Sequence, residues 1–210
     1  VIGTESWLSK DIQSSEVFPD GYNVYRKDRK IGKKTDGDME GGGGVFLMIH
    51  NKYVSVEINE LDVASEIIWA QIQLPGMKYL NVGAFYRPDY TDDTYLESLN
   101  TSLSRVSNNT PHIWLGGDFN LPCIDWNTES TIPGGRDVSK CNRLLEIAAN
   151  HNLTQVQLKP TRGDNNLDLL FTNHPSLVNR AEVIPGIADH EIPILDINLK
   201  ANTTKGRSRR

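Results

Sequence analysis

The apolar run His112-Ile113-Trp114-Leu115 ends at two glycines, which are followed by Asp118, Phe119 and Asn120. A run of this kind predicts a buried strand, and the glycines allow a neighbouring backbone or a ligand to come close. Because Asp118 and Asn120 are two positions apart, their side chains point to the same side of an extended chain. Such a pair can hold a metal or orient a water, and a plain turn with an Asx hydrogen bond is the alternative.

The rest of the chain contains further strand patterns and two helical ones. Apolar residues recur every three to four positions over residues 95–106 and again over 141–149, which predicts two helices that each bury one face. Pro75-Gly76 separates two alternating runs and predicts an antiparallel hairpin. The other expected strands cover residues 45–49, 53–58, 67–74, 80–86, 167–172 and 192–199.

Strands with intervening helices predict a layered α/β fold of packed β-sheets flanked by helices. The pattern shows no linker, so we expect one domain over residues 1–200 and a basic flexible tail over residues 201–210. No run approaches the roughly 18 consecutive apolar residues of a membrane span, so a membrane-spanning protein is not expected. Cys123 and Cys141 lack metal-site spacing, which favours reduced thiols in an intracellular protein and leaves a single disulfide as the alternative.

The net charge of −5 argues against a general nucleic-acid coat protein, but the charge is uneven. Residues 26–34 form a basic run that includes Lys27 and Arg29. It is either a solvated loop or a loop that contacts phosphates. Gly41–Gly44 is followed by no Gly-Lys-Ser/Thr, which excludes a P-loop.

Several polar residues lie at the ends of predicted apolar strands, as Asp118 and Asn120 do. Each of these residues alone could instead be a cap, an edge residue or part of a surface turn, without a catalytic role. Their shared position at strand ends favours one common catalytic site over a chance arrangement. They are Glu5, Tyr86 with Arg87, Asp168, and the pair Asp189-His190.

These segments resemble the endonuclease/exonuclease/phosphatase superfamily, and more closely the apurinic-endonuclease-like domain of non-LTR (LINE-type) retrotransposons. The resemblance extends to about residue 200, with Ala188 where the family usually has Ser. It depends on Thr4-Glu5-Ser6-Trp7-Leu8, Tyr86-Arg87-Pro88, Gly117-Asp118-Phe119-Asn120-Leu121-Pro122, Asp125-Trp126, Pro160-Thr161-Arg162, Leu167-Asp168, Phe171-Thr172-Asn173 and Ala188-Asp189-His190.

The resemblance implies a four-layer α-β-β-α sandwich of two mainly antiparallel sheets flanked by helices. Members of the family begin with a strand that carries a metal-binding Asn, before the segment with the Glu. Because this sequence starts at the Glu5 segment, the first strand is expected to be missing and the domain to be truncated at its amino end.

The implied activity is Mg²⁺-dependent nicking of one strand of double-stranded DNA, with Mn²⁺ as a plausible substitute. The 3′ hydroxyl left at the nick would prime reverse transcription. Glu5 and Asp189 are the implied metal ligands. Asp118 would orient or deprotonate the water, Asn120 would donate to the developing charge, and His190, held by Asp168, would contact the phosphate. Tyr86 would bond the phosphate or leaving oxygen, and the expected substrate-binding residues are Arg87, Arg162, Lys27 and Arg29.

The implied partners are double-stranded DNA and a reverse transcriptase domain on the same longer polyprotein. We expect an intracellular monomer, in the nucleus where its DNA target lies, and no membrane partner. Two alternatives remain. One is a phosphatase of the same superfamily, acting on inositol phosphates or a phospholipid headgroup. The other is a catalytically defective DNA-binding remnant of a decayed element.

Overall fold

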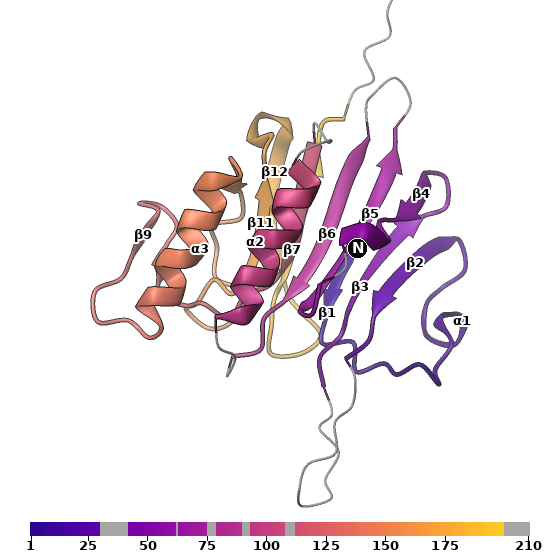
Figure 1. Ribbon diagram of the computed structural model, residues 1–210, viewed down its shortest axis with the longest axis horizontal. Coiled ribbons are helices and arrows are strands. Elements are labelled where there is room, and N and C mark those ends of the chain that lie inside the picture. The colour runs from indigo at the N-terminus through magenta and orange to yellow at the C-terminus, as the bar shows by residue number, and fades with distance from the viewer. Residues whose placement is uncertain (30–41, 62, 75–78, 90–92, 108–111, 200–210) are drawn as a thin grey trace, which may run out of the picture.

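The computed structural model describes residues 1–29, 42–61, 63–74, 79–89, 93–107 and 112–199. The chain is an α/β protein in which two β-sheets pack face to face, and two long helices cover one of them (Figure 1). The expected tail over 201–210, residues 30–34 of the basic run and the Pro75-Gly76 turn lie outside the described residues.

The larger sheet has six strands in the order β10-β11-β7-β6-β5-β4. All neighbouring strands are antiparallel except β6 and β7, which are parallel and are separated in the chain by helix α2. The expected antiparallel pairing of residues 67–74 with 80–86 is confirmed as β5 and β6. The strands are β4 (Val54–Glu57), β5 (Glu66–Gln73), β6 (Leu80–Tyr86), β7 (His112–Asp118), β10 (Thr154–Gln155) and β11 (Asp168–Thr172).

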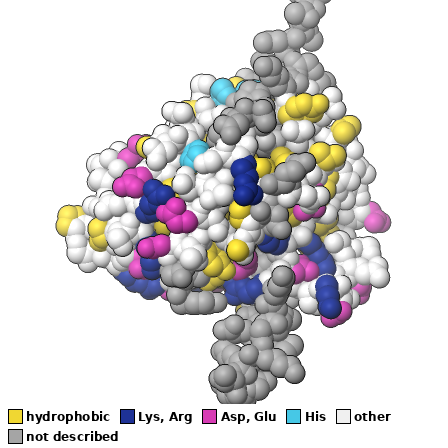
Figure 2. Space-filling view, in the orientation of Figure 1, with side chains coloured by type: hydrophobic (Ala, Val, Ile, Leu, Met, Phe, Trp, Pro, Cys, Tyr) yellow, Lys and Arg dark blue, Asp and Glu magenta, His cyan; other side chains and the backbone are white. Residues whose placement is uncertain are grey.

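Helices α2 (Thr94–Ser107) and α3 (Val138–Asn150) lie on the outer face of this sheet, as their apolar spacing predicts (Figure 1). Leu99 and Leu103 of α2 and Leu144 of α3 are buried in one core with strand residues such as Leu115. Figure 2 shows basic and acidic side chains intermixed on this face. None of the described helices is long and apolar enough to cross a membrane.

Cys141 of α3 is bonded to Cys123 in a disulfide, so the expectation of two reduced thiols is wrong. The helix packs directly on the segment after β7, which brings two buried sulfurs together across 18 residues of chain. Short strands and single turns complete this part of the fold. They are β8 (Ile124–Asp125), β9 (Ser130–Thr131), η1 (Asn59–Leu61) and η2 (Pro175–Leu177).

The second sheet has the order β1-β3-β2, with β1 over Ile2–Thr4, β2 over Tyr22–Lys27 and β3 over Val45–His50. Val45, Leu47 and Ile49 of β3 alternate toward the larger sheet and are buried against it. On the outer face Phe46 contacts Phe18, with 4.8 Å between ring centroids. The outer helical layer implied for this sheet consists, among the described residues, of α1 (Ser14–Val17) alone.

Several strands were not expected from the sequence, and β2 and β12 are the longest of them. Arg26 and Lys27, which were assigned to a basic loop, are the last residues of β2. Strand β12 (Val178–Ile184) forms a separate antiparallel pair with β13 (Ile192–Ile197). None of the residues of β12 is fully buried, so its sequence lacks the apolar alternation that predicts a strand.

An apolar groove of about 680 Å³ lies between β1 and β13, above the inner face of the larger sheet. In the described part of the chain β1 pairs only with β3, and β13 pairs only with β12, so each has an unpaired edge. The groove ends beside Thr4, Gly117 and Asp168. The first strand implied by the resemblance stays a prediction, and this groove has the edges and apolar walls to receive it.

We expect a β-strand seated in this groove to stabilise the fold, because it would pair with β1 and β13 and bury their apolar walls. The chain should be compared with a version that is extended before Val1 by an apolar strand segment. Backbone amides of β1 and β13 should then exchange hydrogen about tenfold more slowly, and Tm should rise. A version with serines in place of the upstream apolar residues is the control. Unchanged exchange at both edges would contradict this placement.

Candidate active site

Three strands of the larger sheet place polar side chains next to one another at one end. Tyr86 is the last residue of β6, Asp118 the last of β7 and Asp168 the first of β11. Tyr86 is the register partner of Asp118, and Asp118 is the register partner of Asp168. Glu5, directly after β1, completes the group from the other sheet, since its carboxylate accepts a 2.6 Å hydrogen bond from the Tyr86 hydroxyl.

The double glycine of β7 permits close packing at this point, as the sequence predicts. Gly117 has φ +145°, and a Cβ there would lie 1.8 Å from the carbonyl oxygen of Phe85. A Cβ on Gly116 would meet side-chain atoms of Leu170 and Ile2 at 2.6 and 2.8 Å. Both positions therefore exclude a side chain.

Asn120 is bound to Asp118 through two hydrogen bonds. Its backbone N–H donates to Oδ1 (3.0 Å) and its side-chain amide donates to Oδ2 (2.9 Å). The same amide nitrogen also donates to the carbonyl of Arg87 at 3.0 Å. Both of its hydrogen atoms are thus in use, and donation to a substrate would require one of these bonds to break.

Arg87 lies beneath the site. It is 0 % exposed, and its guanidinium donates to the carbonyl oxygen of Asn120 at 3.2 Å. Burial lowers the pKa of this guanidinium. The expected substrate contact of Arg87 is not met in this structure, because the side chain supports the turn after β7 from inside the protein.

His190 and Asp168 form a second pair, with 2.8 Å between Nδ1 and Oδ2. Thr161 holds both partners and was noted from the sequence only as part of a motif near the substrate. Its buried hydroxyl oxygen accepts from the N–H groups of Leu167 (3.1 Å) and Asp168 (3.0 Å). Its carbonyl accepts from the N–H of Glu191, next to His190, at 2.7 Å. One residue therefore fixes the start of β11 and the His190 loop together.

The electrostatics of this group favour retention of protons. Burial and the neighbouring Asp168 carboxylate raise the pKa of Asp118 to about 7. The hydrogen bond to Asp168 raises the pKa of His190, and the Asp118 carboxylate adds to this. Burial and the Glu5 carboxylate raise the pKa of Tyr86, so its hydroxyl stays a donor.

Arg162 and Asp189 lie at the exposed rim, where Arg162 Nη2 and Asp189 Oδ2 are 2.5 Å apart. The positive charge of Arg162 is close enough to His190 to oppose the rise in the pKa of the imidazole. Both residues thus lie beside the His190–Asp168 pair. Their assignments as substrate and metal ligands stay predictions.

Arg29 lies behind Tyr86, in a network that the sequence did not reveal. Its guanidinium carbon is 5.5 Å from the centroid of the Tyr86 ring, and its Nε donates to Glu66 at 2.6 Å. Glu66 is the register partner of Tyr86 on β5 and is buried. It also accepts a hydrogen bond from the N–H of Gly44. An acidic residue at the start of an apolar strand was the only sequence signal of this role.

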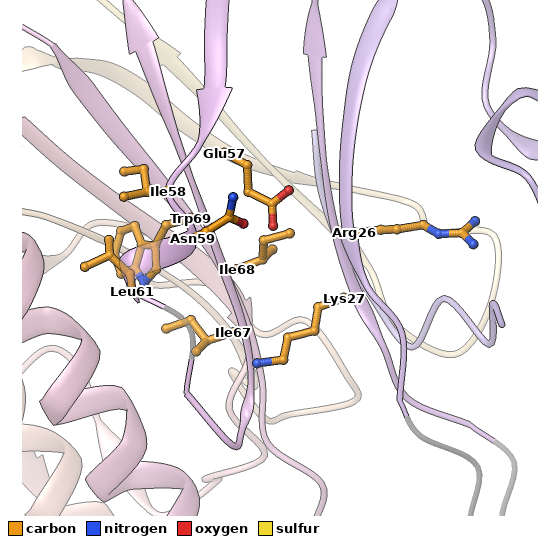
Figure 3. Close-up of a pocket in the computed structure, with 9 residues that line it drawn as sticks. All are labelled: Arg26, Lys27, Glu57, Ile58, Asn59, Leu61, Ile67, Ile68 and Trp69. Atoms are coloured by element: carbon orange, nitrogen blue, oxygen red, sulfur yellow. The ribbon is translucent and has the colours of Figure 1, made fainter. Parts of the chain in front are cut away.

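Lys27 points into a small cavity of about 150 Å³ between β2 and β5, and its Nζ donates to the carbonyl of Val63. Figure 3 shows Lys27 extending toward Ile67, while Arg26 points away from the cavity. No member of the catalytic group lines this cavity. The predicted substrate contacts of Lys27 and Arg29 remain untested, and both side chains are engaged within the protein.

The donor set suits a hard divalent cation, because the group offers carboxylate oxygens and two of the carboxylates are close enough to perturb each other. No cluster of three His, Cys, Asp or Glu side chains in metal-binding geometry occurs among the described residues. Mg²⁺ is usually held by one or two carboxylates, waters and substrate phosphate. The expectation that Glu5 holds such an ion stays a prediction.

Comparisons with known proteins bear on the family and the fold of this chain. A family model described as endonuclease-reverse transcriptase matches residues 80–194. The endonuclease domain of TRAS1, a telomere-specific non-LTR retrotransposon, superposes with a TM-score of 0.66 at 16% identity, covering 88% of this chain and 83% of that one. A Neisseria 3′ phosphatase, NExo, bound to product DNA hairpin gives 0.63 at 11% identity, covering 93% and 87%. The Xenopus laevis APE2 catalytic domain gives 0.60 at 12% identity, covering 94% and 82%. A comparison with curated proteins gives no match.

Replacing the Thr161 hydroxyl should uncouple Asp168 from His190. In Thr161→Val two buried N–H groups lose their acceptor, so Asp168 should shift and the pKa of His190 should fall toward its ordinary value. Thr161→Ser keeps the acceptor and is the matched control. An NMR titration of the His190 imidazole measures the effect. The same imidazole pKa in wild type and Thr161→Val would show that the threonine does not position this pair.

The proton held by the site should make stability fall as pH rises. The pKa of Asp118 is raised above its unfolded value, so between about pH 4 and pH 7 the folded chain binds a proton that the unfolded chain releases. The raised pKa of His190 acts in the same direction, because its contribution is lost above its folded pKa. Thermal unfolding in chelator from about pH 4 to pH 8 should show a loss of several degrees in Tm. Asp118→Asn should show a flatter profile, and an equal slope in both proteins would refute the assignment.

Proposed function

The chain belongs to the endonuclease-reverse transcriptase family, and from this premise we propose that it is a Mg²⁺-dependent endonuclease that nicks one strand of double-stranded DNA. The observation that carries the proposal is the register of Tyr86, Asp118 and Asp168 at one sheet end, with His190 paired to Asp168. Hydrolysis would leave a 3′ hydroxyl, which a reverse transcriptase domain on the same polyprotein would extend in the nucleus. The TRAS1 domain, from a non-LTR retrotransposon, supports this context.

Asp118 is the general base of the proposed reaction. A carboxyl with a pKa of about 7 is substantially ionised at neutral pH and is still basic enough to take a proton from an attacking water. The two hydrogen bonds from Asn120 fix the orientation of the carboxylate. Each oxygen has a further lone pair that can accept from the water.

His190 stabilises the negative charge that builds up on the phosphoryl oxygens. Because Nδ1 faces Asp168, Nε2 is the nitrogen available to the substrate. The raised pKa favours the protonated imidazole, in which this nitrogen donates as part of a cation. Arg162 adds positive charge at the rim beside it.

In the proposed reaction, Tyr86 and Glu5 act on the leaving group. The Tyr86 hydroxyl keeps its proton and is already directed at the Glu5 carboxylate, so it can donate to a substrate oxygen bound there. When bound at Glu5, Mg²⁺ supplies charge neutralisation at the phosphoryl and leaving oxygens. Arg29, held by Glu66, keeps the Tyr86 ring in place from behind.

The proposal predicts that supercoiled plasmid is converted to the open circular form in Mg²⁺ and that EDTA abolishes the conversion. Asp118→Ala and His190→Ala should each lower the nicking rate by about 100-fold or more, since general-base and electrostatic groups contribute on this order. Asp196→Asn, an exposed carboxylate on β13 away from the site, is the matched control and should nick like wild type.

Nicking that persists in EDTA, or that survives both substitutions, would overturn the proposal. Phosphate release from phosphoinositides or inositol phosphates, without nicking, would instead favour the phosphatase alternative. A folded chain that binds DNA and nicks only when a first strand is added before Val1 would show that the site assignment is right and that the site needs this strand.

A further inference from the structure

Trp7 is the exposed tryptophan of this chain, and it lies two residues after Glu5. Its surface is 66% exposed, whereas Trp69, Trp114 and Trp126 are 1%, 5% and 8% exposed. A large indole in water beside a proposed active site has no role in the core. Exposed aromatic rings next to a substrate path commonly serve as contact surfaces.

The backbone holds this indole in an unusual position. Glu5 and Trp7 both have left-handed φ values, 50° and 55°, which residues other than glycine adopt mainly where the surrounding structure enforces them, often at functional sites. The N–H of Trp7 donates to the carbonyl of Gly43 at 3.0 Å, and the N–H of Ser6 donates to that of Gly44 at 3.3 Å. The turn that presents Glu5 therefore also fixes Trp7.

A glycine supports the ring from one side. A Cβ on Gly42 would lie 3.1 Å from a carbon of the Trp7 indole, and Gly42 has φ +100°. The ring thus rests on bare backbone while most of its surface faces solvent. Gly44 in the same segment donates to Glu66, which holds Arg29 over Tyr86, so this support is continuous with the proposed site.

We propose that Trp7 is a stacking platform for a nucleobase next to the scissile phosphate. The proposal rests on the function proposed above, since it assumes a DNA substrate at Glu5. Glu5 and Trp7 are two residues apart, so their Cα atoms are at most about 7 Å from each other, which is within the rise of two nucleotides along one strand, about 3.4 Å each. A rigid indole offers a π-face to any base, so the contact would add affinity with little sequence preference.

The three other tryptophans are buried, so fluorescence quenching by an added ligand reports mainly on Trp7. The probe is a single-stranded oligonucleotide of about 12 nucleotides, added in EDTA so that no cleavage occurs. Its control is an oligonucleotide of the same length in which every base is replaced by an abasic analogue. We expect quenching by the first only, and none in Trp7→Phe. Equal quenching by both, or no quenching by the first, would overturn the stacking role.

Kinetics of plasmid nicking give a second readout. Trp7→Ala should raise the KM about tenfold with kcat little changed, while Trp7→Phe, which keeps a π-face, should stay within about twofold of wild type. Tyr79→Ala is the matched control, because Tyr79 is an exposed ring at the opposite end of β6 from Tyr86. An unchanged KM in Trp7→Ala would contradict the proposal.

The two proposals fail separately. Base-dependent quenching of a wild-type chain that does not nick would overturn the proposed nicking activity and support the contact at Trp7. Normal nicking by Trp7→Ala, without base-dependent quenching in wild type, would support the nicking activity and overturn the contact.

Discussion

Gly117 lets the carboxyl end of β7 approach β6 more closely than any side chain would permit. A Cβ at this position would overlap the Phe85 carbonyl, so a larger residue would force the two strands apart. The parallel register that follows places Asp118 beside Tyr86, and the antiparallel register on the other side of β7 places Asp168 beside Asp118. Glu5 of the second sheet is then reached through the Tyr86 hydroxyl. The spacing of the whole chemical group thus depends on a position without a side chain.

The same spacing places the carboxyl groups of Asp118 and Asp168 close together where water is partly excluded. Ionising both of them therefore raises the free energy of the folded protein. Three sets of hydrogen bonds lower this free-energy cost. Asn120 donates twice to Asp118, His190 shares a proton with Asp168, and Thr161 satisfies the N–H of Asp168 and of its neighbour. What remains is an excess of negative charge that a cation and a protonated imidazole would balance. A site of this kind sacrifices stability in the free protein for interactions that a charged substrate completes.

Strong periodicity made most of the fold predictable. The α2 and α3 faces, the β5–β6 hairpin and the strand ending at Asp118 each have an unambiguous pattern in the sequence. Strand β2 was missed because its polar residues and its basic end resemble a loop, and β12 because none of its residues is fully buried. In the site, the strand-end residues were identified from their positions and the family motifs. Glu66 and the inward directions of Arg29, Lys27 and Arg87 depend on pairing between distant segments, which a single sequence does not contain. The disulfide was missed for the same reason.

The unpaired edges of β1 and β13 also bear on how this chain behaves in concentrated solution. Strand edges with free N–H and C=O groups beside apolar walls can add strands from other molecules, which leads to self-association. Two residues of β13 oppose this. Pro193 has no N–H to donate, and Asp196 places an exposed charge on the same strand. Strand β1 has only three residues, Ile2–Thr4, and so offers little edge. Short length, a proline and a charge therefore oppose the addition of strands from other molecules at the open groove.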